Sequence, residues 1–226
     1  LTYYLDFLKM YFQEEDRFLP LFDISQNLME AYLVVESCIA QVSIVGRRLF
    51  EKVLQKIGYE PSDEEGLQVS IIRDILLWDA FTFGSKEAAK FCAAKFQELL
   101  AGRKVHADIL GSTLKIGAAT NEEAMEYLKN KVTVAETPES EKWFILDALG
   151  CMRDRGKMST IFDFNLEQVP KKNRNRVINM AAQNPIMIDS MWQWFVDNLE
   201  KLGQLHPSIF ENIISSLVPP CGLGKE

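Results

Sequence analysis

The sequence has few of the residues that build metal and redox sites. Its 226 residues include two histidines, His106 and His206, and four cysteines, each more than fifty residues from the next. A catalytic zinc needs at least three converging protein ligands, and a zinc knuckle or dithiol site needs closely spaced cysteines. We therefore expect this segment to bind no metal ion and no cofactor, and we expect most of its cysteines to be buried as small apolar side chains.

Excess basic charge, long apolar runs and glycosylation sites are lacking as well. The 32 acidic residues outnumber the 25 basic ones, so the chain offers no extended basic face to nucleic acid. No run of about 18 apolar residues occurs, and the N-terminus lacks the features of a signal peptide, which predicts no membrane contact. No asparagine begins an Asn-x-Ser/Thr site, and this absence favours a cytoplasmic location.

Apolar residues at helical spacing are abundant instead. Hydrophobic residues make up 47% of the chain, enough to bury a large core. Strand signals are scarce, whereas apolar side chains recur at three- and four-residue intervals, for example Leu67, Ile71, Ile75 and Trp78. This period predicts an all-α fold.

Helix boundaries recur at a regular distance in the second part of the chain. We place the starts of successive helix pairs at Gly66, Lys104, Pro138 and Pro170, separated by roughly 32 to 38 residues, the range of helical-hairpin repeats. Helix caps are expected at Thr120 with Glu123, Thr137-Pro138, Asn184-Pro185 and His206-Pro207, and a break is expected from Gly117 to Thr120. Residues 66–218 are predicted to form about four antiparallel pairs of a HEAT- or armadillo-like α-solenoid with a concave face.

Residues 1–65 are less regular. Long helices are expected around Leu1 to Glu14 and from Gln26 to Ile57, separated by a kinked segment from Phe18 to Phe22. The acidic loop from Glu60 to Glu65 is interpreted as an internal joint and not as a domain boundary. We therefore treat residues 1–226 as a single helical-repeat domain.

Four segments, in this order, resemble a known family. They are Leu67 to Phe81, Ala88 to Phe96, Glu141 to Gly150, and Asn184-Pro followed by Trp192-Gln-Trp-Phe-Val-Asp-Asn-Leu-Glu-Lys-Leu202. They are similar to consecutive helices of the C-terminal domain of M1 family zinc aminopeptidases, the group of the puromycin-sensitive and ER aminopeptidases. Leu199 stands where the family pattern Trp-x-Phe-x-x-Asn-Trp has its second tryptophan. The chain is expected to be truncated at both ends relative to that domain.

The resemblance implies a parent enzyme that removes N-terminal residues from peptides. Its zinc would be held by a His-Glu-x-x-His motif and a downstream Glu in a separate catalytic domain, and neither that motif nor the family's Gly-x-Met-x-Asn motif occurs here. The implied partners are the parent's own catalytic domain upstream and peptide substrates. The segment itself is expected to be inactive alone.

Five cations could contact a peptide on the concave face. Charge-assisted hydrogen bonds from basic side chains can hold the C-terminal carboxylate of a peptide. The candidates for this role are Arg47, Arg73, Lys142, Arg153 and Arg174. Each could instead form a structural ion pair at the surface or between helices.

Two clusters admit a functional and a structural interpretation. The basic run from Pro170 to Arg176 resembles a nuclear-localisation or nucleic-acid patch, but such a run is more often a solvated face. Trp192, Trp194 and Phe195 could form a stacking platform, but their helical spacing favours core packing. We expect the structural role in both cases.

Two functions from different classes remain. The first is a non-catalytic C-terminal domain that covers the active-site chamber of an M1-type zinc aminopeptidase and helps to position peptide substrates. The alternative is an independent HEAT-like scaffold that binds a protein partner on its concave face.

Overall fold

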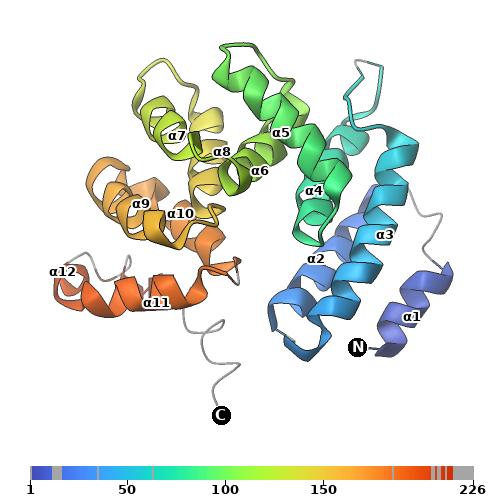
Figure 1. Ribbon diagram of the computed structural model, residues 1–226, viewed down its shortest axis with the longest axis horizontal. Helices are drawn as coiled ribbons and strands as arrows, with labels where there is room; N and C mark the ends of the chain where they lie inside the picture. The colour runs from blue at the N-terminus through green and yellow to red at the C-terminus, as the bar shows by residue number, and fades with distance from the viewer. Residues whose placement is uncertain are drawn as a thin grey trace. The chain divides into compact units, whose positions relative to one another are not determined.

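The computed structural model describes residues 2–11, 17–34, 36–62, 64–184, 186–204, 207, 210–211 and 213–215. All regular secondary structure within these ranges is helical, which confirms the all-α prediction (Figure 1). The α-helices are α1 (Thr2–Tyr11), α2 (Phe18–Val34), α3 (Ile39–Ile57), α4 (Leu67–Thr82), α5 (Lys86–Leu100), α6 (Leu110–Thr120), α7 (Ala124–Thr133), α8 (Glu139–Gly150), α9 (Arg155–Gln168), α10 (Arg174–Ala182), α11 (Ile188–Asp197) and α12 (Leu199–Gly203). Short 3-10 helices η1 (Glu36–Cys38), η2 (Ala107–Ile109) and η3 (Lys171–Asn173) precede α3, α6 and α10.

The chain folds into two compact units, Leu1–Ile116 and Gly117–Glu226. Helices α4 and α5 follow Gly66, α6 and α7 follow Lys104, α8 and α9 follow Pro138, and α10 and α11 follow Pro170. The stacking of these pairs into one solenoid domain over residues 1–226 stays a prediction. None of the helices in the described ranges is long and apolar enough to span a membrane.

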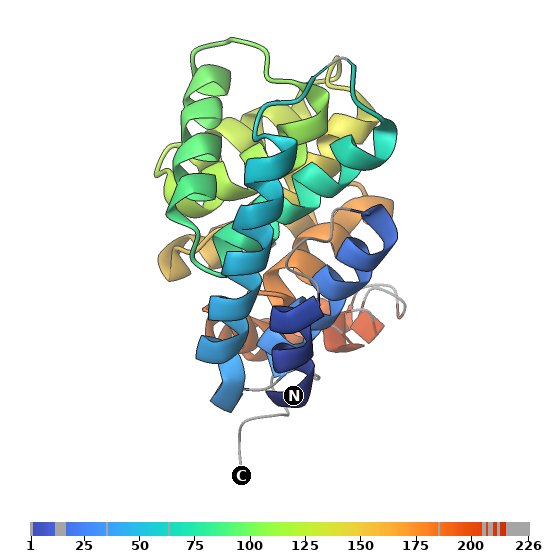
Figure 2. The same ribbon diagram turned by 90° about the vertical axis from the view of Figure 1, so that its right-hand side faces the viewer.

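Unit 1 is built around α3 and α4. Along α3, the side chains at three- and four-residue spacing are buried, namely Val42, Val45, Leu49, Phe50, Val53 and Leu54. Helices α2 and α4 both pack on α3, and α1 lies against α3 with Leu5 and Leu8 buried (Figures 1 and 2). The core of this unit therefore joins four helices.

The first helices differ from the prediction. The helix expected from Gln26 to Ile57 is two helices, α2 and α3, with η1 between them. The kink expected near Pro20 is also wrong. This proline lies in the first turn of α2, where a residue without a backbone N–H leaves no helical hydrogen bond unmade.

Helix α4 buries a different face from the predicted stripe. Leu67 is 75% exposed and Ile71 is 43% exposed, whereas Ile72, Leu76 and Leu77 are fully or almost fully buried. Both faces of this helix carry apolar residues, so the period alone does not choose between them. Packing against α2 and α3 makes that choice.

The boundary between α6 and α7 also corrects the prediction. Helix α6 runs through Gly117 and ends at Thr120, so the expected break at Gly117 and the capping box at Thr120 are wrong. Asn121 makes the turn, because its Oδ1 accepts the backbone N–H of Glu123 at 2.8 Å. Helix α8 begins next to Pro138 as expected, but the Thr137 hydroxyl donates to the carbonyl of Lys131 at 2.8 Å and does not cap the helix. The cap expected at His206 lies outside the described residues.

Unit 2 packs α8 against α7 and α10, and α9 against α10 and α11. Trp194 and Phe195 of α11 are buried, and the ring centroid of Trp194 lies 4.7 Å from that of Phe162 in α9. Trp192 is 39% exposed. Core packing therefore holds for two of the three aromatic residues and only partly for Trp192.

Helices α8 and α10 approach closely at Gly150. A Cβ atom there would lie 2.5 Å from the Val177 carbonyl oxygen and 2.7 Å from the Met180 Cβ. Gly150→Ala should force the two backbones apart and lower the free energy of unfolding by about 2–3 kcal/mol in urea unfolding followed by tryptophan fluorescence. Gly203→Ala is the control, because that position has no neighbour within 4 Å, and its effect should stay below about 1 kcal/mol. Equal effects at both positions would contradict the close approach.

Candidate functional site

The structure divides the five predicted cations between the two units. Arg47 and Arg73 belong to unit 1, whereas Lys142, Arg153 and Arg174 belong to unit 2. Arg47 is half-buried on α3, with Nη1 3.8 Å from the position that a Cβ of Gly84 would take beside the turn after α4. Each residue is therefore judged within its own unit.

Arg73 is not available to a peptide. Its side chain is 0% exposed, its Nη1 and Nη2 donate to both carboxylate oxygens of Glu65, and its Nε donates to the Gly58 carbonyl at 2.9 Å. Nη2 also donates to the Ile57 carbonyl at 3.1 Å. The prediction that Arg73 contacts substrate is corrected, because this guanidinium ties the loop before α4 to the end of α3.

Lys142 lines a hollow between the end of α7, the start of α8 and the turn from α9 to η3. The hollow has a volume of about 410 Å³, within the usual range of ligand pockets. Its wall includes Val132, Thr133, Glu139, Lys142, Leu146, Gln168, Val169, Pro170, Lys172 and Asn173. We call this feature the α8 hollow.

The charges in the α8 hollow are partly paired. Glu139 Oε1 accepts from Asn173 Nδ2 at 3.1 Å and lies 3.0 Å from Lys172 Nζ. The hydrogen bond from Asn173, together with that from Lys172 and the charges of Lys172 and Lys142, holds the pKa of Glu139 below its ordinary value. Lys142 forms no ion pair with any described residue. Its ammonium group is therefore the cation of this hollow that remains available to an anion.

Arg174 stands beside the same hollow. Its Nε donates to the carbonyl of Val169, a wall residue, at 2.9 Å. Arg153 lies elsewhere in unit 2, in a second hollow of about 270 Å³ that Asp154 and Lys157 also line. Of the three unit 2 candidates, Lys142 lines the α8 hollow, Arg174 donates to one residue of its wall, and Arg153 lines a different hollow.

The basic run from Pro170 to Arg176 is not one solvated face. Lys171 and Lys172 are exposed, but Arg176 is half-buried, with Nη2 2.5 Å from Asp147 Oδ2 and the guanidinium 5.6 Å from the ring centre of Trp143. Sequence reasoning assigned Lys172 to this run and missed its place in the α8 hollow. The signal that could have found it is its position two residues after Pro170, at the predicted start of a helix pair.

The arrangement suits recognition of a small anion. A lysine ammonium donates up to three hydrogen bonds, and a carboxylate can accept them with charge assistance. The neighbouring Asn173 and Lys172 are already bound to Glu139, so they fix the wall of the hollow around Lys142. No group of His, Cys, Asp or Glu in the described ranges could hold a metal ion, and His106 uses its Nδ1 to accept the N–H of Asp108 at 3.2 Å.

Comparison with known proteins gives one family for this chain. The family described as "ERAP1-like C-terminal domain" matches residues 1–222. None of the curated proteins compared with the chain matches it.

Proposed function

Since the chain belongs to the family of ERAP1-like C-terminal domains, we propose that it covers the active-site chamber of an M1-type zinc aminopeptidase and helps to position peptide substrates. The zinc and the residues that activate water belong, in this proposal, to the catalytic domain of the same protein. The segment contributes the exclusion of water and the placement of substrate, both of which can accelerate hydrolysis without a chemical group of its own.

The observation that carries this proposal is the match along almost the whole chain. It supports a domain of an aminopeptidase better than the alternative of an independent scaffold, for which no described feature names a partner. No His or Cys lines the α8 hollow, and no group of His, Cys, Asp or Glu among the described residues could hold a metal ion. A role in binding is therefore what the hollow itself supports.

The α8 hollow is the proposed contact for the far end of a peptide. Lys142 would bind the terminal carboxylate, while Leu146, Val132 and Val169 offer apolar surface to the last side chain. Arg174 would add positive potential at the rim, since its Nε is held by the Val169 carbonyl. Arg47 and Arg153 remain proposed substrate contacts, but neither lines the α8 hollow.

The test is peptide binding by the 226-residue chain, measured by fluorescence anisotropy with a labelled nine-residue peptide. Lys142→Ala should weaken binding of the free acid about tenfold, the loss of one charge-assisted hydrogen bond. Wild type should bind the C-terminal amide of the same peptide about as weakly as Lys142→Ala binds the free acid. Lys142→Ala should bind the amide no more weakly still, because the substitution and the amide remove the same interaction between the ammonium and the carboxylate.

The matched control is Lys171→Ala. This lysine is exposed on η3 near the hollow but does not line it, so its removal should change the affinity less than twofold. Equal affinity of the acid and the amide for wild type, with no effect of Lys142→Ala, would contradict the assignment of Lys142 to the carboxylate.

A further inference from the structure

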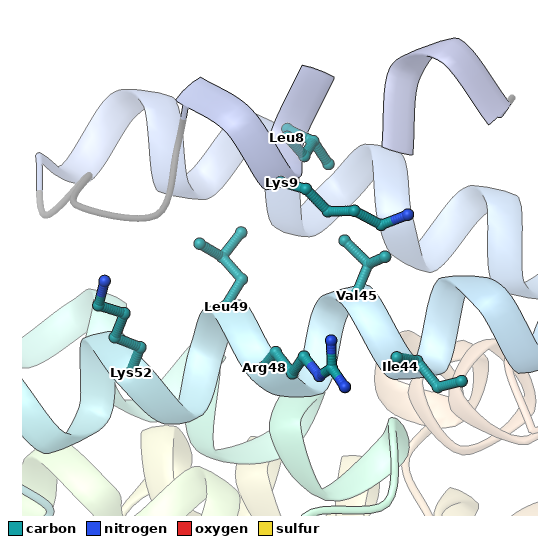
Figure 3. A pocket seen from close by; sticks show the side chains of 7 residues that line it. All are labelled: Leu8, Lys9, Ile44, Val45, Arg48, Leu49 and Lys52. Atoms are coloured by element: carbon teal, nitrogen blue, oxygen red, sulfur yellow. The ribbon is translucent and has the colours of Figure 1, made fainter. Parts of the chain in front are cut away.

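The pocket between α1 and α3 of unit 1 is a place where two helices pack against each other. Figure 3 shows Val45 and Leu49 pointing from α3 toward Leu8 of α1, and none of the three is more than 6% exposed. Lys9 at its edge is paired with Asp6, with 2.9 Å between Nζ and Oδ1. The pocket therefore offers a ligand neither an accessible apolar surface nor a cluster of free cations.

Unit 2, in contrast, leaves a large aromatic side chain accessible beside the α8 hollow. Trp143 directly follows Lys142 on α8 and is 43% exposed, and the next residue, Phe144, is 37% exposed. Lys142 lines the hollow and forms no ion pair with any described residue. Tryptophan is among the residues that contribute most to binding when a partner covers them. This part of α8 thus combines an accessible ring with an available cation.

The ring of Trp143 is held by its neighbours. The guanidinium of Arg176 lies 5.6 Å from the ring centre, and Arg176 Nη2 lies 2.5 Å from Asp147 Oδ2, one turn further along α8. Helix α10, which carries Arg176, packs on α8. We call the exposed ring together with Arg176 and Asp147 the Trp143 platform. Because these contacts restrain the ring before a ligand arrives, binding there costs less conformational entropy.

We infer that the Trp143 platform is a second subsite for the peptide at the α8 hollow and selects an aromatic side chain at the third residue from the peptide's C-terminus. This assignment rests on the proposed function, in which Lys142 binds the terminal carboxylate and the last side chain enters the hollow. Side chains of an extended peptide alternate between two sides, and residues two apart are separated by roughly 7 Å. The third residue from the end is therefore the next one to face α8.

An aromatic side chain suits this platform better than the other classes do. A flat ring can stack on the tryptophan and gain roughly two- to tenfold in affinity beyond the burial of its area. An aliphatic side chain would gain only the burial of area. A lysine or arginine side chain would meet the positive charges of Arg176 and Lys142, and a carboxylate would leave the ring of Trp143 uncovered.

The test is fluorescence anisotropy of the 226-residue chain with labelled nine-residue peptides that differ only at the third residue from the end. Wild type should bind the phenylalanine peptide about tenfold more tightly than the alanine peptide. It should bind the phenylalanine peptide about threefold more tightly than the cyclohexylalanine peptide, which keeps the size of the side chain without the aromatic ring. Trp143→Ala should remove both preferences and keep the preference for the free acid over the amide, because Lys142 is still present. Trp143→Phe, which keeps a ring, should retain a preference of about threefold for phenylalanine over alanine.

Trp192→Ala is the matched control, because Trp192 is a tryptophan of similar exposure in the same unit that does not line the α8 hollow. It should bind the phenylalanine peptide as wild type does, and circular dichroism should show that all variants keep their helical content. A wild-type preference for phenylalanine over alanine below about threefold, or one that Trp143→Ala leaves unchanged, overturns the inference. A preserved preference for the free acid then leaves the proposed function standing, whereas equal affinity for the acid and the amide contradicts both.

Discussion

Arg73→Ala should lower the free energy of unfolding by about 3–5 kcal/mol, the range for breaking one side of a buried ion pair. The substitution leaves the Glu65 carboxylate without the guanidinium that binds both its oxygens. It also removes the donor to the carbonyls of Ile57 and Gly58, at the end of α3. Urea unfolding followed by circular dichroism measures the loss, and limited proteolysis should cut the segment from Gly58 to Gly66 faster in the variant.

Two further variants separate this effect from a general sensitivity to lost arginines. Arg103→Ala, at an exposed position of the same unit, should change stability by less than about 0.5 kcal/mol. Replacing both Arg73 and Glu65 by methionine removes the two charges together and should cost less than Arg73→Ala alone. An Arg73→Ala chain as stable as wild type would show that the loop before α4 does not depend on this pair.

Asp79 gives the second large effect, a fall in stability as pH rises. Burial raises the pKa of Asp79 from 3.8 to about 7, while the hydrogen bond from Ser25 and the charge of Lys115 oppose the shift. Between pH 3.8 and about pH 7, Asp79 is therefore protonated in the folded chain and ionised in the unfolded chain. The stabilisation is complete below pH 3.8 and is lost by about pH 7, and its size is roughly 4 kcal/mol.

Asp79→Asn isolates this contribution from the other carboxylates. The amide carries no charge, so the variant should gain stability relative to wild type between pH 4 and pH 8, by up to roughly 4 kcal/mol. Urea unfolding of both proteins across this range measures the difference. A difference that does not change with pH would contradict a buried carboxylate at this position.

Ser25→Ala provides the matched variant. The Ser25 hydroxyl donates to Asp79 Oδ2 at 2.5 Å and joins α2 to α4. Without this bond, which favours the charged carboxylate, the pKa of Asp79 should rise further. The pH-dependent loss of stability should then extend above pH 7.

The helix pattern was largely predictable, because the spacing of apolar residues and the residues that begin and end a helix lie close together in the sequence. Pro138, predicted as the start of a helix pair, directly precedes α8. Asp154 caps α9, because its Oδ1 accepts the Gly156 N–H at 2.9 Å. The errors arose where local signals were ambiguous. A glycine such as Gly117 is tolerated inside a helix when packing compensates for its entropy, and sequence alone does not show that packing.

The candidate site was predictable only in part. Lys142 and Arg174 were singled out as cations, and the structure adds that Lys142 lines the α8 hollow and that Arg174 donates to the carbonyl of Val169 in its wall. The pairing of Glu139 with Lys172 and Asn173 was not visible, because these partners are about 34 residues apart and meet only when α8 packs on the segment before α10. For the same reason the sequence left open whether Arg73 contacts a peptide or forms a structural ion pair.

The sequence by itself determined the helical class and, through the order of its motifs, the family to which the chain belongs. The helical class and the family motifs both depend on residues close together in the chain, because helical hydrogen bonds and the spacing of apolar side chains are local. The tertiary structure alone decided which basic side chains are buried in ion pairs and which face a hollow. That choice depends on partners distant in sequence, since the free energy of a charge is set by the water and opposite charges that packing leaves around it.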